Sequence, residues 1–404
     1  MQLEWLESAS ITSPLGWKAG AAYAQIKTYG DEPRFDVGLL VSERPCAVGG
    51  LFTKNKVCGA PVTVTRPRVQ KGIAQALVVN SGCSNVAMGE RGIADARKMT
   101  ESAALHLGLD PELVLVASTG VIARPLPLDR IASVMPRIEL ARESGRRFTR
   151  AMMTTDTVEK VRAVRFEIDG VVYTVAGSAK GSGMVHPDMA TVFCFLTTDA
   201  NVSSVWLQDA VRRVGNASIN MVDVDMDTST SDTMLVFANG AAGGPCLSDN
   251  PTQAAQLEKA LLAVSVELAK DLARDGEGAT TLIEAVVSGA HSEQDARAAA
   301  RTVVSSPLIK SMITGRDPNL GRVLMALGRS GAELAVERLS VWIGEHQAFA
   351  RGVPTDLPHA VISQAMASET VVLRADLGLG EHTATAWGCN LTDEYVHING
   401  DYTT

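Results

Sequence analysis

The sequence predicts a mixed α/β fold, in the broad sense that includes α+β, and three observations support this class. The first is composition: 46% of the 404 residues are apolar and 20% are charged, which is enough for a sizeable hydrophobic core. The second is that short apolar runs alternate with longer segments of helical periodicity. The third is that no linker rich in Pro, Gly or Ser divides the chain, which predicts intertwined lobes.

Six short apolar runs predict buried β-strands. Each run contains β-branched or aromatic residues and ends in the small or polar residues that form turns. In chain order, the predicted strands lie within residues 74–82, 113–121, 171–179, 190–198, 233–240 and 281–289.

Two longer segments, 92–109 and 251–276, predict α-helices. Pro251 suits the first turn of the second helix, and Gly276 suits its far end. Apolar residues recur in this helix at spacings of four and three, which places them on one face. These residues are Leu257, Leu261, Val264, Leu268 and Leu272.

Charge and cysteine content exclude several classes of function. The net charge of −8 argues against nucleic acid and against an anionic membrane surface as partners. No apolar run approaches the ~18 residues that a membrane-spanning helix needs. The six cysteines include no C-x-x-C pair, so neither a zinc site nor a disulfide scaffold is expected. Reduced thiols, and a start without the apolar region of a secretory signal, predict a cytoplasmic protein.

Five clusters of glycine, hydroxyl and amide residues follow the predicted strands or helices. They lie at residues 80–82, 118–120, 154–156, 180–183 and 275–278. Any one cluster is explained by turn formation. Five clusters with several hydroxyls and few long charged side chains predict convergence on one polar pocket.

Two metal or catalytic alternatives are weaker. Asp223, Asp225 and Asp227 alternate as in a calcium loop, but the sixth and twelfth positions are Thr228 and Met234 in place of glycine and glutamate. A hydrogen-bonded turn is the better prediction there, and no metal or cofactor is expected. His186 precedes Pro187 near Thr191, but the sequence shows no carboxylate to orient it. It is therefore expected only to line the site.

Thr191 lies where a glycine-rich segment meets an apolar run. A threonine hydroxyl is a weak nucleophile unless a base activates it, and an N-terminal threonine carries its own α-amino base. That arrangement requires a cut between Ala190 and Thr191, and the small Ala190 leaves room for the hydroxyl to attack its carbonyl. The alternative is a β-branched residue that begins a strand, which these residues alone favour.

The segment "KGSGMVHPDMATV" resembles the self-cleavage segment of the ornithine acetyltransferase family, the bifunctional glutamate N-acetyltransferases of arginine biosynthesis. Further blocks resemble the family in the same order along the chain. They are "LFTKNKVCGAPV", "VVNSGCSNVAMG", "VASTGVI", "MTTDT", "DTSTSDT", "DGEGATTLIE", "SPLIKSMITGRDPNLGR" and "YVHINGDYTT". The resemblance implies a layered α/β sandwich, self-cleavage into chains 1–190 and 191–404 that intertwine, and an α2β2 heterotetramer.

The resemblance also implies a ping-pong reaction. Thr191 would take the acetyl group from N-acetylornithine and pass it to glutamate, so small amino acids and their N-acetyl derivatives are the expected partners. Thr119 and Gly120 match the family's oxyanion-hole residues. The substrate-binding positions, besides the nucleophile, match Thr154, Lys180, Glu277, Asn399 and Thr404.

Five positions depart from the family's usual residues: Cys83, Ser84, His186, Asp188 and Leu320. These departures bear on the identity of the substrate more than on the acyl-transfer reaction. A paralogue with another acyl donor or amine acceptor is one alternative, and an N-acyl amidohydrolase on the same scaffold is another. A non-catalytic ligand-binding protein that is never cut is a third alternative, which the Ala190-Thr191 pair and the oxyanion block oppose.

Overall fold

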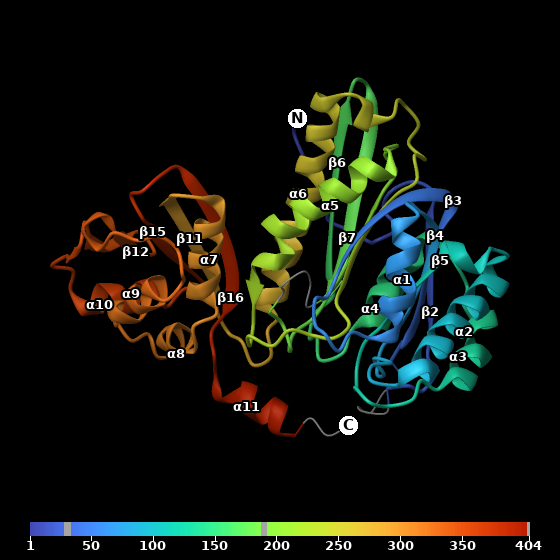
Figure 1. Ribbon diagram of the computed structural model, residues 1–404, viewed down its shortest axis with the longest axis horizontal. Coiled ribbons are helices and arrows are strands. Elements are labelled where there is room, and N and C mark those ends of the chain that lie inside the picture. The colour runs from blue at the N-terminus through green and yellow to red at the C-terminus, as the bar shows by residue number, and fades with distance from the viewer. Residues whose placement is uncertain (28–33, 187–191, 402–404) are drawn as a thin grey trace.

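The computed structural model describes residues 1–27, 34–186 and 192–401, and it confirms the predicted mixed α/β class (Figure 1). Within the described residues, the strands form one sheet of nine strands and one of seven. Figure 1 shows that each sheet belongs to its own lobe. All six predicted strands and both predicted helices are present.

The larger sheet has the order β1-β6-β7-β8-β10-β3-β4-β5, with β2 paired to β3. Its strands are β1 (Glu4–Trp5), β2 (Trp17–Ala22), β3 (Val37–Phe52), β4 (Ile73–Asn80), β5 (Val114–Ser118), β6 (Lys160–Ile168), β7 (Val171–Lys180), β8 (Phe193–Thr198) and β10 (Thr233–Ala238). Strand β8 is antiparallel to β7 and parallel to β10, so the segments before and after the Ala190-Thr191 pair share one sheet.

The smaller sheet has the order β14-β13-β12-β15-β11-β16-β9. Its strands are β9 (Val222–Asp223), β11 (Leu282–Ala290), β12 (Ser340–Ile343), β13 (His346–Ala350), β14 (Val353–Pro354), β15 (Thr370–Asp376) and β16 (His382–Cys389). Because β9 precedes β10 in the chain, the backbone enters the smaller sheet and then returns to the larger one. This exchange is the intertwining that the missing linker predicts.

Helices cover both sheets. They are α1 (Ala60–Gln70), α2 (Gly89–Leu107), α3 (Leu128–Val134), α4 (Gly145–Met152), α5 (Ser204–Ala217), α6 (Pro251–Arg274), α7 (Glu293–Val304), α8 (Pro307–Gly315), α9 (Leu320–Gly328), α10 (His359–Ala365) and α11 (Asp393–Gly400). Asn250 caps α6 by accepting from the backbone N–H groups of Thr252 and Gln253. The predicted apolar face of α6 is fully buried.

Helix α6 packs closely on β7 of the larger sheet. A Cβ atom on Gly177 of β7 would lie 2.7 Å from Cδ1 of Leu268, so the glycine lets the helix approach. On β8, the rings of Phe193 and Phe195 lie with centroids 5.4 Å apart, and the ring of Phe148 from α4 packs on Phe195 at 6.2 Å. The first residues of β8 are therefore held in a packed core.

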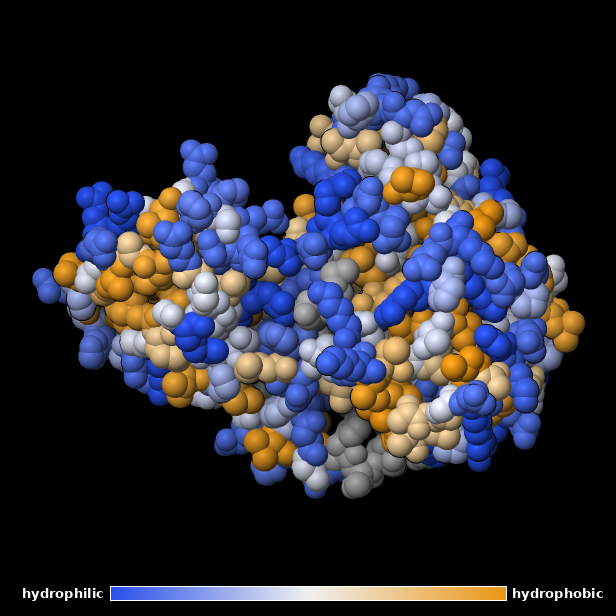
Figure 2. All heavy atoms as spheres, viewed as in Figure 1, coloured by the Kyte–Doolittle hydropathy of each residue, from blue (hydrophilic) through white to orange (hydrophobic). Residues whose placement is uncertain are grey.

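The outer surface is largely polar on the face seen in Figure 2, where a notch separates the two lobes at the top of the view. Among the described residues, no helix combines the length and the apolar character needed to span a bilayer. Helix α11 extends away from the smaller sheet (Figure 1), and it carries Asn399 back to the polar cavity described below.

Candidate active site

A cavity of about 390 Å³ lies where β5 and β7 end and β8 begins. Six of the predicted site residues line it: Thr119, Gly120, Thr154, Lys180, Glu277 and Asn399. They belong to segments far apart in sequence, so the predicted convergence of polar clusters is confirmed for four of the five clusters. The fifth, residues 80–82, lies behind the cavity, where Asn80 accepts from the backbone N–H of Thr119 at 3.0 Å.

Gly120 occupies a backbone position that only glycine fits. Its φ is +124°, and a Cβ atom there would lie 2.4 Å from the carbonyl carbon of Gly82 and 2.6 Å from the nitrogen of Cys83. Among the described residues, the N–H of Gly120 has no hydrogen-bond partner. The peptide group of Gly120 therefore offers a donor at the cavity that a ligand can use.

Thr119 offers a second donor beside it. The Nζ of Lys180 donates to Oγ1 of Thr119 at 3.3 Å. An ammonium group only donates, so Thr119 accepts from it and keeps its own hydroxyl hydrogen for another acceptor. The side chain of Thr119 is nearly buried, with 9% of the residue exposed. Thr119 and Gly120 can thus both donate to one oxygen atom in the cavity.

Lys180 is the last residue of β7 and pairs with Phe193, the first residue of β8. Only 8% of it is exposed, and burial lowers its pKa, although the carboxylate of Asp156 opposes that shift. Val192 also lines the cavity. The strand pairing therefore places a buried ammonium group beside the point where the chain enters β8.

A buried network of charged side chains links segments that line the cavity. The Nζ of Lys160 donates to Asp156 at 2.7 Å and also contacts Asp275, and its side chain is fully buried. Asp156 further accepts from the N–H of Gly181 at 2.7 Å. Burial alone would raise the pKa of Asp156, but the charges of Lys160 and Lys180 outweigh it and hold that pKa below its usual value. The network ties together three of the predicted polar clusters.

Replacing Lys160 with methionine is expected to cost about 3–5 kcal/mol of unfolding free energy, because two buried carboxylates lose their shared cation. Urea unfolding followed by circular dichroism measures this change. Lys71→Met is the matched control, since Lys71 and Glu112 form an exposed pair, and it is expected to cost at most about 1 kcal/mol. Equal losses in the two variants would contradict the supporting role of Lys160.

The same network makes stability depend on pH. The pKa of Asp156 is lower in the folded protein than in the unfolded chain, so the carboxylate stabilises the fold above the unfolded value of about 3.9. That contribution is lost as the pH falls from there toward the folded pKa. The loss on acidification is expected to be smaller in Lys160→Met, where the depressed pKa is no longer maintained by Lys160.

Glu277 is held against the glycine-rich segment. Its backbone N–H donates to the carbonyl of Ser182 at 2.8 Å, and a Cβ atom on Gly183 would lie 2.3 Å from Oε2 of Glu277. Gly183 therefore leaves the space that this carboxylate occupies. The Nδ2 of Asn399 donates to Oε2 at 2.8 Å. Helix α11, which follows β16 of the smaller sheet in the chain, thus brings Asn399 into contact with Glu277.

Sequence reasoning missed Asp232 as a cavity residue. Only 2% of it is exposed, and its Oδ2 has no hydrogen-bond partner among the described residues. Burial raises its pKa well above the usual value, while Ser229 and Lys180 oppose the shift. Its neighbour Thr233 pairs with Phe193, so β10 carries Asp232 beside the start of β8. The "DTSTSDT" block was a signal that could have singled it out.

The prediction for His186 is wrong in two respects. His186 is not among the residues that line the cavity. It also has an orienting carboxylate, since its Nδ1 lies 2.7 Å from Oδ1 of Asp223, while its Nε2 lies 3.0 Å from a guanidinium nitrogen of Arg301. The partner was missed because Asp223 is 37 residues away in sequence. His186 joins β9 to α7.

The aspartates after β9 form the predicted hydrogen-bonded turn. Asp225 accepts from the backbone N–H groups of Met184, Val185 and Asp227. Asp223 accepts from His186 and forms an ion pair with Lys310 at 3.0 Å. These contacts anchor residues 184–186, which lie just before the Ala190-Thr191 pair in the sequence.

The remaining predicted positions fall elsewhere. Ala190, Thr191, Asp188 and Thr404 lie outside the described residues. Cys83 is buried directly behind Gly120, with its Sγ 3.2 Å from the carbonyl oxygen of Arg124. Leu320 begins α9 and packs against the core of the smaller lobe. It does not line the 390 Å³ cavity.

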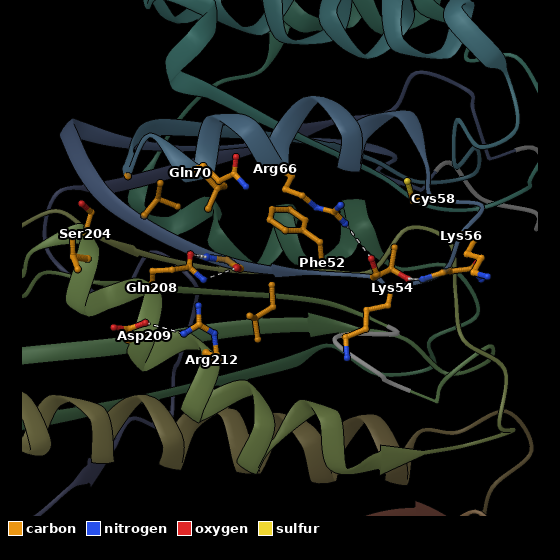
Figure 3. Close-up of a pocket in the computed structure, with 18 residues that line it drawn as sticks. Phe52, Lys54, Lys56, Cys58, Arg66, Gln70, Ser204, Gln208, Asp209 and Arg212 are labelled. Atoms are coloured by element: carbon orange, nitrogen blue, oxygen red, sulfur yellow. Dashed lines mark hydrogen bonds and ion pairs between the residues drawn. The ribbon is translucent and has the colours of Figure 1, made fainter.

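A larger cavity, of about 980 Å³, contains none of the predicted site residues (Figure 3). Its cations lie on exposed side chains. Arg66 donates to the carbonyl of Thr53 and lies over the ring of Phe52, and Arg212 pairs with Asp209 (Figure 3). Size alone therefore does not identify the active site, and the convergence of buried polar groups is the better guide.

Comparison with known proteins places the chain in a family. The model of the ArgJ family matches residues 18–404. The arginine biosynthesis bifunctional protein ArgJ of Symbiobacterium thermophilum is 47% identical over the full length of both chains. This chain belongs to the ArgJ family. A second ArgJ relative, from Dehalococcoides mccartyi, is 43% identical over 100% of this chain and 99% of its own length.

A solved ArgJ structure agrees with this placement. The crystal structure of the arginine biosynthesis bifunctional protein argJ from Bacillus halodurans is 38% identical to this chain and has a TM-score of 0.50. The match covers 98% of that ArgJ chain but 52% of this one. Membership of the ArgJ family confirms the resemblance found in the sequence.

Proposed function

We propose that this ArgJ-family chain cuts itself between Ala190 and Thr191 and then transfers an acetyl group from N-acetylornithine to glutamate through an acetyl ester on Thr191. The observation that carries the proposal is the cavity at the start of β8. Two hydrogen-bond donors, a buried ammonium group and a carboxylate from distant segments converge there, at Thr119, Gly120, Lys180 and Glu277. These are the groups that acyl transfer between amino acids requires.

The nucleophile would be the Thr191 hydroxyl, and the α-amino group released by the cut would be its base. Val192, the next residue, lines the cavity. The solved Bacillus halodurans chain corresponds to only about half of this one, which supports a family whose members are cut into two chains. Strands β7 and β8 would hold chains 1–190 and 191–404 together through their paired residues. The α2β2 assembly stays a prediction.

Acylation begins when the Thr191 oxygen attacks the acetyl carbonyl and its proton passes to the α-amino group. The carbonyl oxygen then becomes an oxyanion, which the N–H of Gly120 and the hydroxyl of Thr119 would stabilise. The intermediate collapses when the ornithine nitrogen leaves with a proton. Glutamate enters, its amino group attacks the ester carbonyl and gives up a proton, and the Thr191 oxygen takes a proton from the α-amino group as it leaves as the hydroxyl.

N-acetylornithine and glutamate share one centre, an α-carbon that carries a carboxylate and a nitrogen. We assign the carboxylate of that centre to Lys180 and the side-chain ammonium of ornithine to Glu277, with Thr154 and Asn399 beside them. Thr404 would complete the site by the family pattern. The amide of Asn399 already orients the Glu277 carboxylate, so the carboxylate is held in place before the substrate arrives.

Glu277→Gln is expected to lower kcat/KM for N-acetylornithine about ten- to a hundredfold, because a charge-assisted contact is lost while the shape is kept. The glutamine oxygen can still accept from Asn399, so the fold and the cut are expected to persist. Steady-state kinetics with the fully cut variant measures the loss. Glu258→Gln, which alters an exposed pair with Arg213, is the control. Near-normal use of N-acetylornithine by Glu277→Gln would rule out this assignment.

The function is tested by following N-acetylornithine consumption with and without glutamate. A transferase consumes the donor rapidly only when the acceptor is present, and N-acetylglutamate appears in equal amount. Equal consumption without glutamate would identify an amidohydrolase instead. Failure with glutamate but turnover with another amine would identify a paralogue with a different acceptor.

A further inference from the structure

A second cavity, of about 820 Å³, adjoins the active-site cavity. The two cavities share Thr154, Thr155 and Glu277 among their lining residues. A substrate side chain that leaves the acetyl-transfer cavity past Glu277 therefore enters this second space. The residues that line it decide which side chains are accepted.

Lys27 lines the second cavity and is 4% exposed. Its Nζ donates to the carbonyl oxygens of Phe35 at 2.9 Å and Arg150 at 3.5 Å, and both of these residues line the same cavity. Among the described residues, no carboxylate oxygen lies within ion-pair distance of this Nζ. A buried ammonium group held only by neutral carbonyl groups is costly without an anion.

Five carboxylates around Lys27, among the residues that the structure describes, are already engaged by other groups. Asp36 accepts from three backbone N–H groups, those of Ala24, Ile26 and Lys27 itself. Asp156 and Asp275 share Lys160. Glu159 pairs with Arg146 and Arg150, and Glu277 accepts from Asn399. Lys27 is therefore a buried cation in this cavity that retains capacity for an added anion.

The charge on Lys27 is present at neutral pH. Burial lowers its pKa to about 8, and the positive charge of Lys180 acts in the same direction, while Asp36 and Asp156 oppose the shift. Lys27 lines this cavity and Lys180 lines the adjoining one, and the two cavities share Thr154, Thr155 and Glu277.

We infer that Lys27 binds the side-chain carboxylate of the acyl acceptor, so that a dicarboxylic amino acid is held between Lys180 and Lys27. This inference rests on the proposed acetyl transfer. The donor and the acceptor then use different subsites beyond their shared centre: Glu277 takes the ammonium of the donor side chain, and Lys27 takes the carboxylate of the acceptor side chain. Lys27 is thus a specificity residue for the second half-reaction.

The test uses the cut enzyme and separates the two half-reactions. Exchange of the acetyl group between N-acetylornithine and isotopically labelled ornithine requires only the first half-reaction and its reversal. Transfer to glutamate requires the acceptor subsite. Lys27→Met is expected to keep exchange within about twofold of wild type and to lower kcat/KM for glutamate about ten- to a hundredfold, as for a charge-assisted contact.

Glutamine is the matched acceptor, because it has the shape of glutamate without the side-chain charge. Wild type is expected to prefer glutamate over glutamine by about the factor that Lys27→Met loses, and the variant is expected to use the two almost equally. Lys71→Met is the control variant, since it makes the same substitution at an exposed lysine that pairs with Glu112 and lines neither cavity. Its use of glutamate is expected to match wild type.

Three outcomes overturn the inference: undiminished use of glutamate by Lys27→Met, equal losses of exchange and transfer, or a wild type that does not distinguish glutamate from glutamine. The last result needs no variant, so it decides the matter even if Lys27→Met fails to fold. Absence of exchange in wild type is a different result, because it contradicts the proposed function itself.

Discussion

Thr191→Ala is expected to remain a single chain of 404 residues and to transfer no acetyl group above background. The substitution removes the hydroxyl that would attack the Ala190 carbonyl, so the α-amino base is never released. General base catalysis alone supplies about 10²–10⁴-fold, and the variant lacks both the base and the nucleophile. Denaturing electrophoresis and the acetyl-transfer assay measure the two losses on one preparation.

Thr191→Ser is the matched control, because serine keeps a hydroxyl at the same position. It is expected to be cut, more slowly than wild type, and to retain transfer. A wild-type protein that stays uncut and yet transfers acetyl groups would contradict the N-terminal threonine mechanism. A Thr191→Ala protein that is still cut would place the junction elsewhere.

Thr119→Ala is expected to lower kcat and kcat/KM together by about 10²–10³-fold while the chain is still cut and folded. Its hydroxyl is a donor left available beside the N–H of Gly120, and such a contact strengthens only as the carbonyl oxygen gains charge. Steady-state kinetics with N-acetylornithine and glutamate measures both constants.

Thr119→Ser is the control for this prediction, since it restores the hydroxyl without the methyl group. Recovery of most of the lost rate is expected. A rise in KM alone in Thr119→Ala would show that Thr119 holds the ground state and is not an oxyanion donor.

Much of the fold follows from local patterns. The leucine face of α6 and the apolar run that becomes β8 are visible in sequence, because helices and buried strands impose their own periodicity. The assignment of each strand to one of the two sheets was not predicted. The chain crosses between the sheets at the two-residue strand β9, which pairs with β16 at Val222 and Asp223 and is too short to show any periodicity.

The residues of the candidate site also fall into a group that was predictable from the sequence and a group that was not. Residues in glycine-rich turns, such as Thr119 and Glu277, stand out because their motifs are local and resemble family blocks. Lys27, Lys160 and Asp232 do not, since their importance comes from burial and from partners brought together through space. His186 shows the limit most directly: its carboxylate partner Asp223 is contributed by β9, and no spacing rule connects the two.

The central claim is that Thr191 becomes an N-terminal residue and carries the acetyl group. Intact-mass measurement of the purified protein, mixed with N-acetylornithine and quenched before glutamate is added, tests it most directly. Two chains are predicted, with masses for residues 1–190 and 191–404, and the second is expected to gain one acetyl group that glutamate then removes. Peptide mapping is expected to place that group on the Thr191 oxygen. A single uncut mass, or an acetyl group on any other residue, would contradict the account.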